Sequence, residues 1–175
     1  MKLNVLGNEQ AQPWYADGLS FTCSQCGNCC TGGPGYVWIS EVEIDRLADF
    51  LQMPRLEVLK RYCRKIGGRI SFKERILGPQ RHDCVFLEEI ESTQYDPRAG
   101  REVRTTKRIC RVYDVRPLQC RTWPFWPENL DSRRAWNAAA RKCPGMSRPG
   151  RDFTREQIEA LRDSEDWPER PPTSE

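Results

Sequence analysis

The sequence predicts a small single domain of the α+β class, with short helices, a mid-chain β-hairpin and much irregular structure. The chain has 175 residues, a length that suits one domain better than two. Residues 41–51 repeat apolar side chains at helical spacing, and two strand-like runs, 85–90 and 103–112, flank a turn-rich stretch. Because 38% of the residues are hydrophobic and 30% are charged, we expect a modest core.

The folded part is expected to span residues 14–165, between a flexible lead-in at 1–13 and a flexible tail at 166–175. No apolar run approaches the roughly 20 residues that a membrane helix needs. The first ten residues also lack the apolar stretch of a secretory signal. A cytoplasmic location is therefore expected.

Capping signals and apolar spacing predict the helices. Ser40 and Glu43 stand three apart, as in a capping box, and the apolar residues of 44–51 repeat at i, i+3, i+4 and i+7. Pro54 is expected to open a second helix, which Gly67-Gly68 ends. Two shorter helices are expected at 131–141 and after a second capping box, Thr154-Arg-Glu-Gln157.

Strand signals are fewer. Tyr36-Val-Trp-Ile39 is a short strand-like run. Val85 to Ile90 and Val103 to Val112 are expected to form the arms of a hairpin, with turn chemistry supplied by Asp96-Pro-Arg-Ala-Gly100.

Four cysteines lie within eight residues, in the order Cys23-Ser-Gln-Cys26-Gly-Asn-Cys29-Cys30. We call this segment the knot. Two residues between ligands let a tight turn aim both sulfurs at one metal, so the spacing fits zinc and iron–sulfur centres alike. Glycine at position 27 suits such a turn because it tolerates positive φ. Four more cysteines follow downstream: Cys84, Cys110, Cys120 and Cys143.

Metal binding explains these cysteines better than disulfides do. Nine cysteines among 175 residues fall below the 8–10% or so of a disulfide scaffold, and the count is odd. In a reducing compartment, such spacing is typical of metal or catalytic sites. The formal charge of +3 is largely offset once thiolates are counted, so nucleic acid is not an expected partner and neither is a membrane.

The adjacent pair Cys29-Cys30 leaves the architecture of the centre open. Neighbouring side chains on an extended backbone point to opposite faces, so both are poor ligands for a single ion. The eight sulfurs could make two four-thiolate sites, one bridged binuclear site, or one cluster with spare thiols. The run C-x-x-C-x-x-C and the pair Cys143-Pro144 are similar to ferredoxin ligands, which favours iron–sulfur over zinc.

Other residue types near the cysteines have more ordinary interpretations. Cys63 falls on the apolar side of a predicted helix and is expected to be a buried hydrophobe. His82 is expected on the surface beside Asp83 rather than on a metal. The arginines near Cys110 and Cys120 are expected to balance thiolate charge, with an anionic substrate as the alternative. The aromatic residues Trp123, Phe125 and Trp126 are expected to shield the centre from water.

The cysteines and their neighbours resemble a known family. The order CxxCxxCC, C-x-F-L, C-x-x-Y-x-x-R-P-x-x-C-R-x-x-P-F and CPG, running from about Trp14 to Gly145, is similar to the YkgJ-like cysteine-cluster family. That family is described as a zinc- or iron-chelating domain, and flagellin lysine N-methylases carry a similar one. The resemblance implies a ligand set of Cys23, Cys26, Cys29, Cys30, Cys84, Cys110, Cys120 and Cys143. It also implies a supporting shell that includes Tyr113, Arg116, Arg121 and Phe125, to which the shielding role adds Trp123.

Three functions are compatible with this sequence. The first is a metal-binding protein with an iron–sulfur cluster, a 4Fe-4S centre by preference, in a redox role or one linked to S-adenosylmethionine. The second is a structural Zn²⁺ module that binds another molecule without catalysis. The third is a metallochaperone or sensor that exchanges metal through Cys29-Cys30. An unidentified protein or small molecule is the expected partner, and whether the chain is an enzyme is left open.

Overall fold

The computed structural model describes residues 12–164, which form a mixture of short helices and small antiparallel hairpins. The predicted α+β class is thus confirmed. The predicted tail and all but two residues of the predicted lead-in lie outside the described residues. In chain order, the elements are β1 Leu19–Phe21, η1 Asn28–Cys30, α1 Glu41–Leu51, α2 Arg55–Tyr62, β2 Cys63–Ile66, β3 Arg69–Phe72, β4 Glu74–Gly78, β5 Arg81–Cys84, β6 Leu87–Asp96, β7 Arg101–Cys110, η2 Tyr113–Val115, α3 Leu118–Thr122, α4 Pro127–Leu130, α5 Arg133–Ala140, η3 Pro144–Met146, β8 Arg151–Phe153 and α6 Arg155–Arg162.

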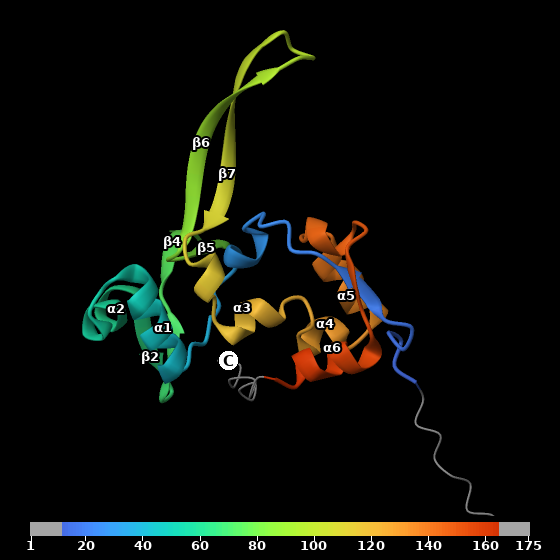
Figure 1. The fold of residues 1–175 in the computed structure, drawn as a ribbon, viewed down its shortest axis with the longest axis horizontal. Coiled ribbons are helices and arrows are strands. Elements are labelled where there is room, and N and C mark those ends of the chain that lie inside the picture. The colour runs from blue at the N-terminus through green and yellow to red at the C-terminus, as the bar shows by residue number, and fades with distance from the viewer. Residues whose placement is uncertain (1–11, 165–175) are drawn as a thin grey trace, which may run out of the picture.

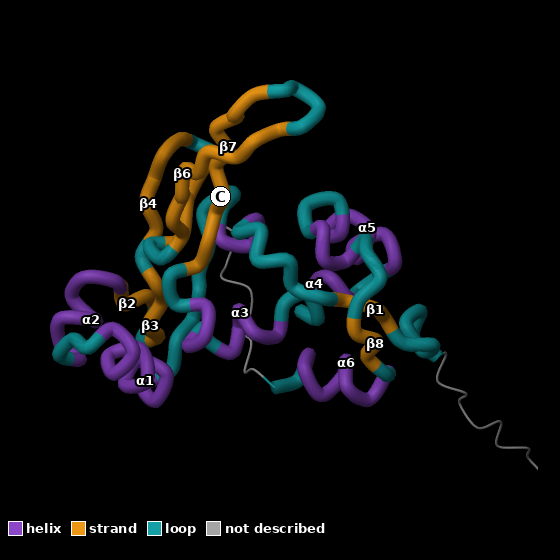
Figure 2. Tube along the Cα trace, turned by 45° about the horizontal axis from the view of Figure 1, so that its top comes forward, coloured by secondary structure: helices purple, strands orange, loops and turns teal. Residues whose placement is uncertain are grey.

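The molecule has two lobes with α3 between them, and a long hairpin projects from the body (Figure 1). One lobe holds α1, α2 and the β2–β3 hairpin, and the other holds α4, α5, α6 and the β1–β8 pair (Figure 2). Within residues 12–164, no helix is both long and apolar enough to cross a membrane.

Each lobe has its own hydrophobic core. The first core gathers apolar side chains of α1, α2 and β3, together with Phe86 and Val112. The second packs Phe21, Phe125, Trp136 and Ile158, with Phe125 against both Phe21 and Trp136. Burial of these side chains stabilises each lobe by about 1.5–3 kcal/mol per large residue. Two separate cores leave a seam between the lobes, and most of the candidate site lies there.

Helix α1 forms as predicted. Ser40 and Glu43 make the reciprocal bonds of a capping box, while Ile44 and Leu47 are fully buried. Helices α5 and α6 confirm the two shorter helices, and α6 begins at the capping box of Thr154 and Gln157. The chain then brings its two described ends together, since β1 and β8 pair antiparallel.

The second predicted helix is wrong over its last turn. It ends at Tyr62, and residues 63–66 form strand β2, which pairs with β3. Gly67 and Gly68 have φ of 53° and 85°, the conformation that a two-residue hairpin turn requires. The pair of glycines therefore makes a hairpin and does not simply stop a helix. The strand-like run at 36–39 is confirmed only in part: it pairs with β3 through one bridge, between Trp38 and Ser71, and does not form a full strand.

The mid-chain hairpin is confirmed and is longer than expected. Strands β6 and β7 pair without interruption from Leu87 with Cys110 to Asp96 with Arg101. The turn follows the predicted chemistry, because the Asp96 carboxylate accepts a hydrogen bond from the backbone N–H of Arg98.

Candidate metal centre

All eight family cysteines line one cavity between the two cores. Cys84 and Cys110 pack against the first core, whereas Cys23 and Cys143 belong to the second. None of the nine cysteines in the chain forms a disulfide. Residues up to 120 positions apart in sequence thus place their sulfurs around a common space, which is the arrangement a bound metal centre requires.

Six of the eight cysteines lie in or directly beside a secondary-structure element, whereas Cys23 and Cys26 lie in the irregular stretch between β1 and η1. Cys29 and Cys30 lie in the single turn η1, and Cys120 lies in α3. Cys84 and Cys110 are the last residues of β5 and β7, and Cys143 directly precedes η3. Because strand ends and helix starts have well-defined backbones, most of these sulfurs are held by regular structure.

The knot turns at Gly27, as its sequence predicts. Gly27 has φ of 70°, and a β-carbon there would lie 2.8 Å from Leu87 Cδ1 and 2.9 Å from Arg108 Cβ. Two independent reasons therefore exclude a larger residue: the left-handed backbone and the close approach of the hairpin. The knot is packed against the base of β6 and β7.

The side chain of Asn28 links the knot to two remote cysteine segments through hydrogen bonds. Its Nδ2 donates to the carbonyl oxygen of Lys142 at 2.7 Å, next to Cys143. Its Oδ1 accepts a hydrogen bond from the guanidinium of Arg108, two residues before Cys110. One side-chain amide thus fixes three of the segments that surround the cavity.

The buried carboxylate of Asp83 links the knot to the strand that ends in Cys84. Asp83 is 2% exposed and accepts a hydrogen bond from Thr31 Oγ1 at 2.5 Å, so the residues adjoining Cys30 and Cys84 are linked. The backbone N–H of His82 also donates to the carbonyl of Gly32 at 2.7 Å. These bonds hold the strand that ends in Cys84 beside the knot.

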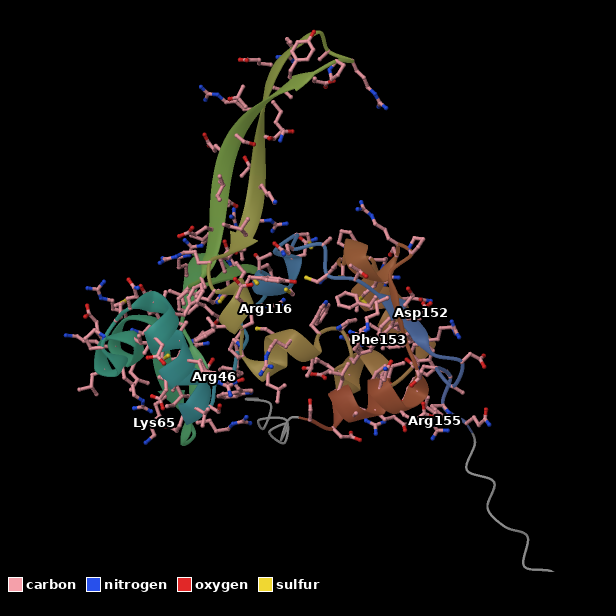
Figure 3. The ribbon with its side chains drawn as sticks, in the orientation of Figure 1. Arg46, Lys65, Arg116, Asp152, Phe153 and Arg155 are labelled. Atoms are coloured by element: carbon pink, nitrogen blue, oxygen red, sulfur yellow. The ribbon has the colours of Figure 1, made fainter. Side chains whose placement is uncertain are left out.

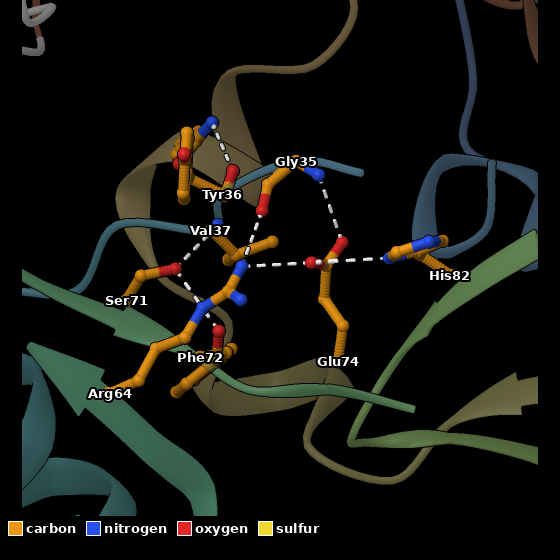
Figure 4. A network of polar contacts seen from close by, with 9 residues as sticks. Gly35, Tyr36, Val37, Arg64, Ser71, Phe72, Glu74 and His82 are labelled. Carbon is orange, nitrogen blue, oxygen red and sulfur yellow. Dashed lines mark hydrogen bonds and ion pairs between the residues drawn. The ribbon is translucent and has the colours of Figure 1, made fainter. Parts of the chain in front are cut away.

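The loop after the knot is held by an ionic network (Figure 4). Arg64 donates to the carbonyl of Gly35 at 2.7 Å and to the Glu74 carboxylate at 2.8 Å. The other oxygen of Glu74 accepts from the Gly35 N–H at 3.1 Å. Strands β2 and β4 therefore clamp the chain that leaves Cys30.

Cys120 has a tie of the same kind. The neighbouring side chain, Gln119, is 6% exposed, and its Oε1 accepts from the N–H of Trp38 at 2.7 Å. Its Nε2 donates to the carbonyl of Tyr36 at 3.2 Å. Buried amides are costly unless both ends are bonded, so this pairing fixes α3 against the first lobe.

The predicted supporting shell divides into residues that reach the cavity and residues that do not. Tyr113, Arg116 and Trp123 line it, and the Nε1–H of Trp123 points at Cys143 Sγ at 3.4 Å. Arg116 lies between the two lobes (Figure 3) and stacks on Tyr113, with its guanidinium carbon 3.5 Å from the ring centre. By contrast, Arg121 pairs with Glu43 at 3.3 Å, and Phe125 is buried in the second core.

The cysteine thiols influence one another strongly. A hydrogen bond from Cys30 lowers the pKa of Cys110 to about 7 and also lowers the pKa of Cys29. The same bonds, together with burial, raise the pKa of Cys30. Burial raises the pKa of Cys84 to about 12 and that of Cys120 well above its usual range. Because metals bind thiolates, loading this site must release protons.

The spacing of the sulfurs bears on the kind of centre. Within residues 12–164, no three cysteine, histidine or acidic side chains are arranged to hold a single metal ion. The adjacent pair is close, with 3.7 Å between Cys29 Sγ and Cys30 Sγ. The cavity measures about 50 Å³, several times the roughly 10–15 Å³ that one water needs. The cysteine sulfurs that line the cavity suit a soft metal. The volume of the cavity is larger than a single metal ion needs.

The remaining thiol and the single histidine lie elsewhere. Cys63 is 6% exposed and packs in the first core, which is the buried position expected for it. His82 is half-buried rather than on the surface, with Nδ1 3.8 Å from Glu74, and it does not line the cavity.

Sequence reasoning missed the polar ties: Asn28, Thr31, Asp83 and Gln119. Their position next to a candidate cysteine is the sequence signal that could have identified them. Each is a short polar residue directly beside a candidate cysteine. A polar side chain next to a metal ligand often orients that ligand.

The fold and the cavity define a small cysteine-rich metal-binding protein. More particularly, the chain belongs to the CxxCxxCC family, described as a "Putative zinc- or iron-chelating domain", whose profile matches residues 22–144. The chain is 31% identical over 111 residues to the uncharacterized protein MJ0661 of Methanocaldococcus jannaschii. That match covers 63% of this chain and 48% of the relative, so the chain spans about half the relative's length. No solved structure matches the chain.

Proposed function

We propose that the eight cysteines hold an iron–sulfur centre with more than one metal atom, and that the protein works in electron transfer. The observation that carries this proposal is the shared cavity, which all eight of these cysteines line. Thiolate sulfur selects zinc or iron–sulfur clusters, so the donor set agrees with the proposal.

Geometry favours a polynuclear centre over separate zinc ions. Four sulfurs bound tetrahedrally at about 2.3 Å lie about 3.8 Å from one another. A cluster keeps its cysteine sulfurs further apart, because its own metal and sulfide atoms fill the middle. A cavity of about 50 Å³ lined by eight cysteines suits the second arrangement.

The walls of the cavity suit a redox centre. Phe21, Val37, Phe72, Phe86 and Val112 line it beside the cysteines. Apolar walls limit water and lower the local dielectric, and both effects tune the reduction potential of a cluster. Arg116 supplies a positive charge in the same wall, which favours electron-rich states of the centre.

Anaerobic purification tests the proposal. The native protein should be brown, contain iron and acid-labile sulfide in near-equal amounts, and bleach on reduction with dithionite. A colourless anaerobic sample without iron or sulfide would overturn it. The parallel sample carrying Cys26→Ser should lose most of the colour.

A structural zinc module is the second candidate, and the Cys29–Cys30 pair supports it. Their 3.7 Å separation equals one edge of a tetrahedral zinc–sulfur site. This candidate predicts one or two zinc ions per chain and unfolding on chelation. An unchanged melting curve in strong chelator would contradict it.

The resemblance to flagellin lysine N-methylases supports a role linked to S-adenosylmethionine for the same centre. Equilibrium dialysis of S-adenosylmethionine against the iron-loaded protein tests this form of the proposal. Saturable binding that disappears in the apoprotein would support it, and equal retention by both forms would contradict it.

A further inference from the structure

The β6–β7 hairpin extends well beyond the body of the molecule. We call residues 87–110 the arm. Ten paired residues in each strand make it about 30 Å long. Its base is anchored: Arg75 donates to the carbonyl of Leu87, Arg81 pairs with Glu89 at 2.9 Å, and Arg111 pairs with Glu88 at 3.2 Å. The distal part stands away from both lobes (Figure 1).

The arm has two unpaired edges. No other strand among residues 12–164 pairs with β6 or β7. Two-stranded ribbons are marginally stable alone, and their edges can pair with a further strand. The side chains add to this exposure, since Ile90 and Tyr95 are 45% and 65% exposed. Such a ribbon is suited to gain stability from a partner.

Charge is distributed unevenly over the arm. It carries five acidic and five basic residues, but the acids at its base, Glu88 and Glu89, are paired with arginines of the body. The tip and β7 hold four exposed cations that make no ion pair within the described chain: Arg98, Arg101, Arg104 and Lys107. They outnumber the two exposed, unpaired acids, Glu91 and Glu102. The β7 side is therefore basic.

Two alternative partners fit the charges of the arm less well than an acidic strand does. A second copy of β7 carries the same net positive charge, so a two-fold pairing of β7 with itself would bring like charges together. A nucleic acid bound against the face of Arg104 would meet the carboxylates of Glu91 and Glu102, because both lie on that face. Neither arrangement suits the charges.

We propose that the free edge of β7 binds an extended, acidic segment of a partner protein as a third strand. Main-chain hydrogen bonds to β7 would supply affinity. Successive side chains of the added strand alternate between faces, so acids on one face would meet Arg101 and Lys107, and an acid on the opposite face would meet Arg104. This inference is independent of the metal that fills the cavity.

A random ten-residue peptide display library, selected on the full-length protein, is the probe. The enriched peptides should be acidic. Their dissociation constants, measured by fluorescence anisotropy, should rise at least tenfold for R104E/K107E. N-methylation of alternate backbone amides should abolish binding, since it removes strand pairing.

The control R134E/R148E makes the same change of charge at exposed arginines outside the arm and should bind within twofold of the wild type. Metal content and circular dichroism should match across all three proteins, which separates loss of binding from misfolding. Enrichment of peptides that are not acidic, or equal binding to R104E/K107E, would overturn the proposal. So would failure to enrich any peptide, concentration-dependent dimerisation through the arm, or binding of a 20-base-pair DNA duplex lost in R104E/K107E.

Discussion

The side-chain amide of Asn28 joins the knot to Lys142, 2.7 Å from nitrogen to carbonyl oxygen, across 114 positions of sequence. The same side chain accepts from Arg108. Asn28 therefore sits where the Cys29, Cys110 and Cys143 segments meet, and it holds them together without being a ligand.

Replacing Asn28 with alanine should weaken metal binding more than it lowers the stability of the fold. Both bonds are lost, and two polar partners are left without their acceptor or donor, at a cost of about 1–3 kcal/mol. We expect the metal affinity of Asn28→Ala to fall about 10–100-fold, in the range seen when groups that orient ligands are removed. Competition with a chromogenic chelator measures this change.

Asn137→Ala is the matched control, because Asn137 is exposed on α5, away from the cavity. It should keep wild-type metal affinity. If both alanine variants bind metal as the wild type does, Asn28 has no positioning role.

Gly27→Ala should be much more harmful than Gly100→Ala. Both glycines have positive φ, at 70° and 65°, so both substitutions carry the left-handed strain of about 1–2 kcal/mol. Gly100 has open space around it, whereas a β-carbon at Gly27 meets Leu87 and Arg108. We expect urea unfolding to show a loss of stability of about 1 kcal/mol for Gly100→Ala and at least twice that for Gly27→Ala. Equal losses would mean that close packing of the knot on the hairpin is unimportant.

Two cysteine variants should differ sharply. Cys26 lines the cavity, and Cys26→Ser should remove most of the bound metal. Cys63 lies in the first core, and Cys63→Ala should keep the metal while losing about 1–2 kcal/mol of stability. Elemental analysis after anaerobic purification gives the comparison. Equal metal in both variants would refute the assignment of the ligand set.

Cys63 should also resist alkylation in the folded protein. Burial raises the pKa of Cys63 to about 11. The thiolate is the reactive form, so at pH 8 its fraction falls to about one in a thousand, and reactivity should rise as the pH approaches 11. Iodoacetamide labelling followed by mass spectrometry tests this from pH 7 to 10. Labelling of Cys63 at pH 8 as fast as an unfolded control would contradict it.

Sequence reasoning was most successful where local signals act alone. The capping boxes at Ser40 and Thr154 fix their helices through bonds between residues three apart, so no distant contact is needed. The turn from Asp96 to Gly100 is equally local. The structure at Gly67-Gly68 was harder to predict, because a glycine pair can end a helix or form the turn of a hairpin. The pairing of β2 with β3, which is not a local signal, decides between the two.

The geometry of the site could be predicted only in part. Cysteine spacing and family resemblance indicated eight candidate ligands, and these line one cavity. The division into two cores, with the cavity at their seam, depends on tertiary packing and has no local signal. The links through Asn28, Asp83 and Gln119 join residues more than 50 positions apart, which spacing alone cannot reveal.

X-ray absorption at the metal edge of anaerobically purified protein tests the central claim most directly. We predict a first shell of sulfur alone at about 2.3 Å, with a second shell from neighbouring metal atoms. A first shell dominated by nitrogen or oxygen, or a sample without bound metal, would contradict the proposal that these cysteines enclose a metal centre.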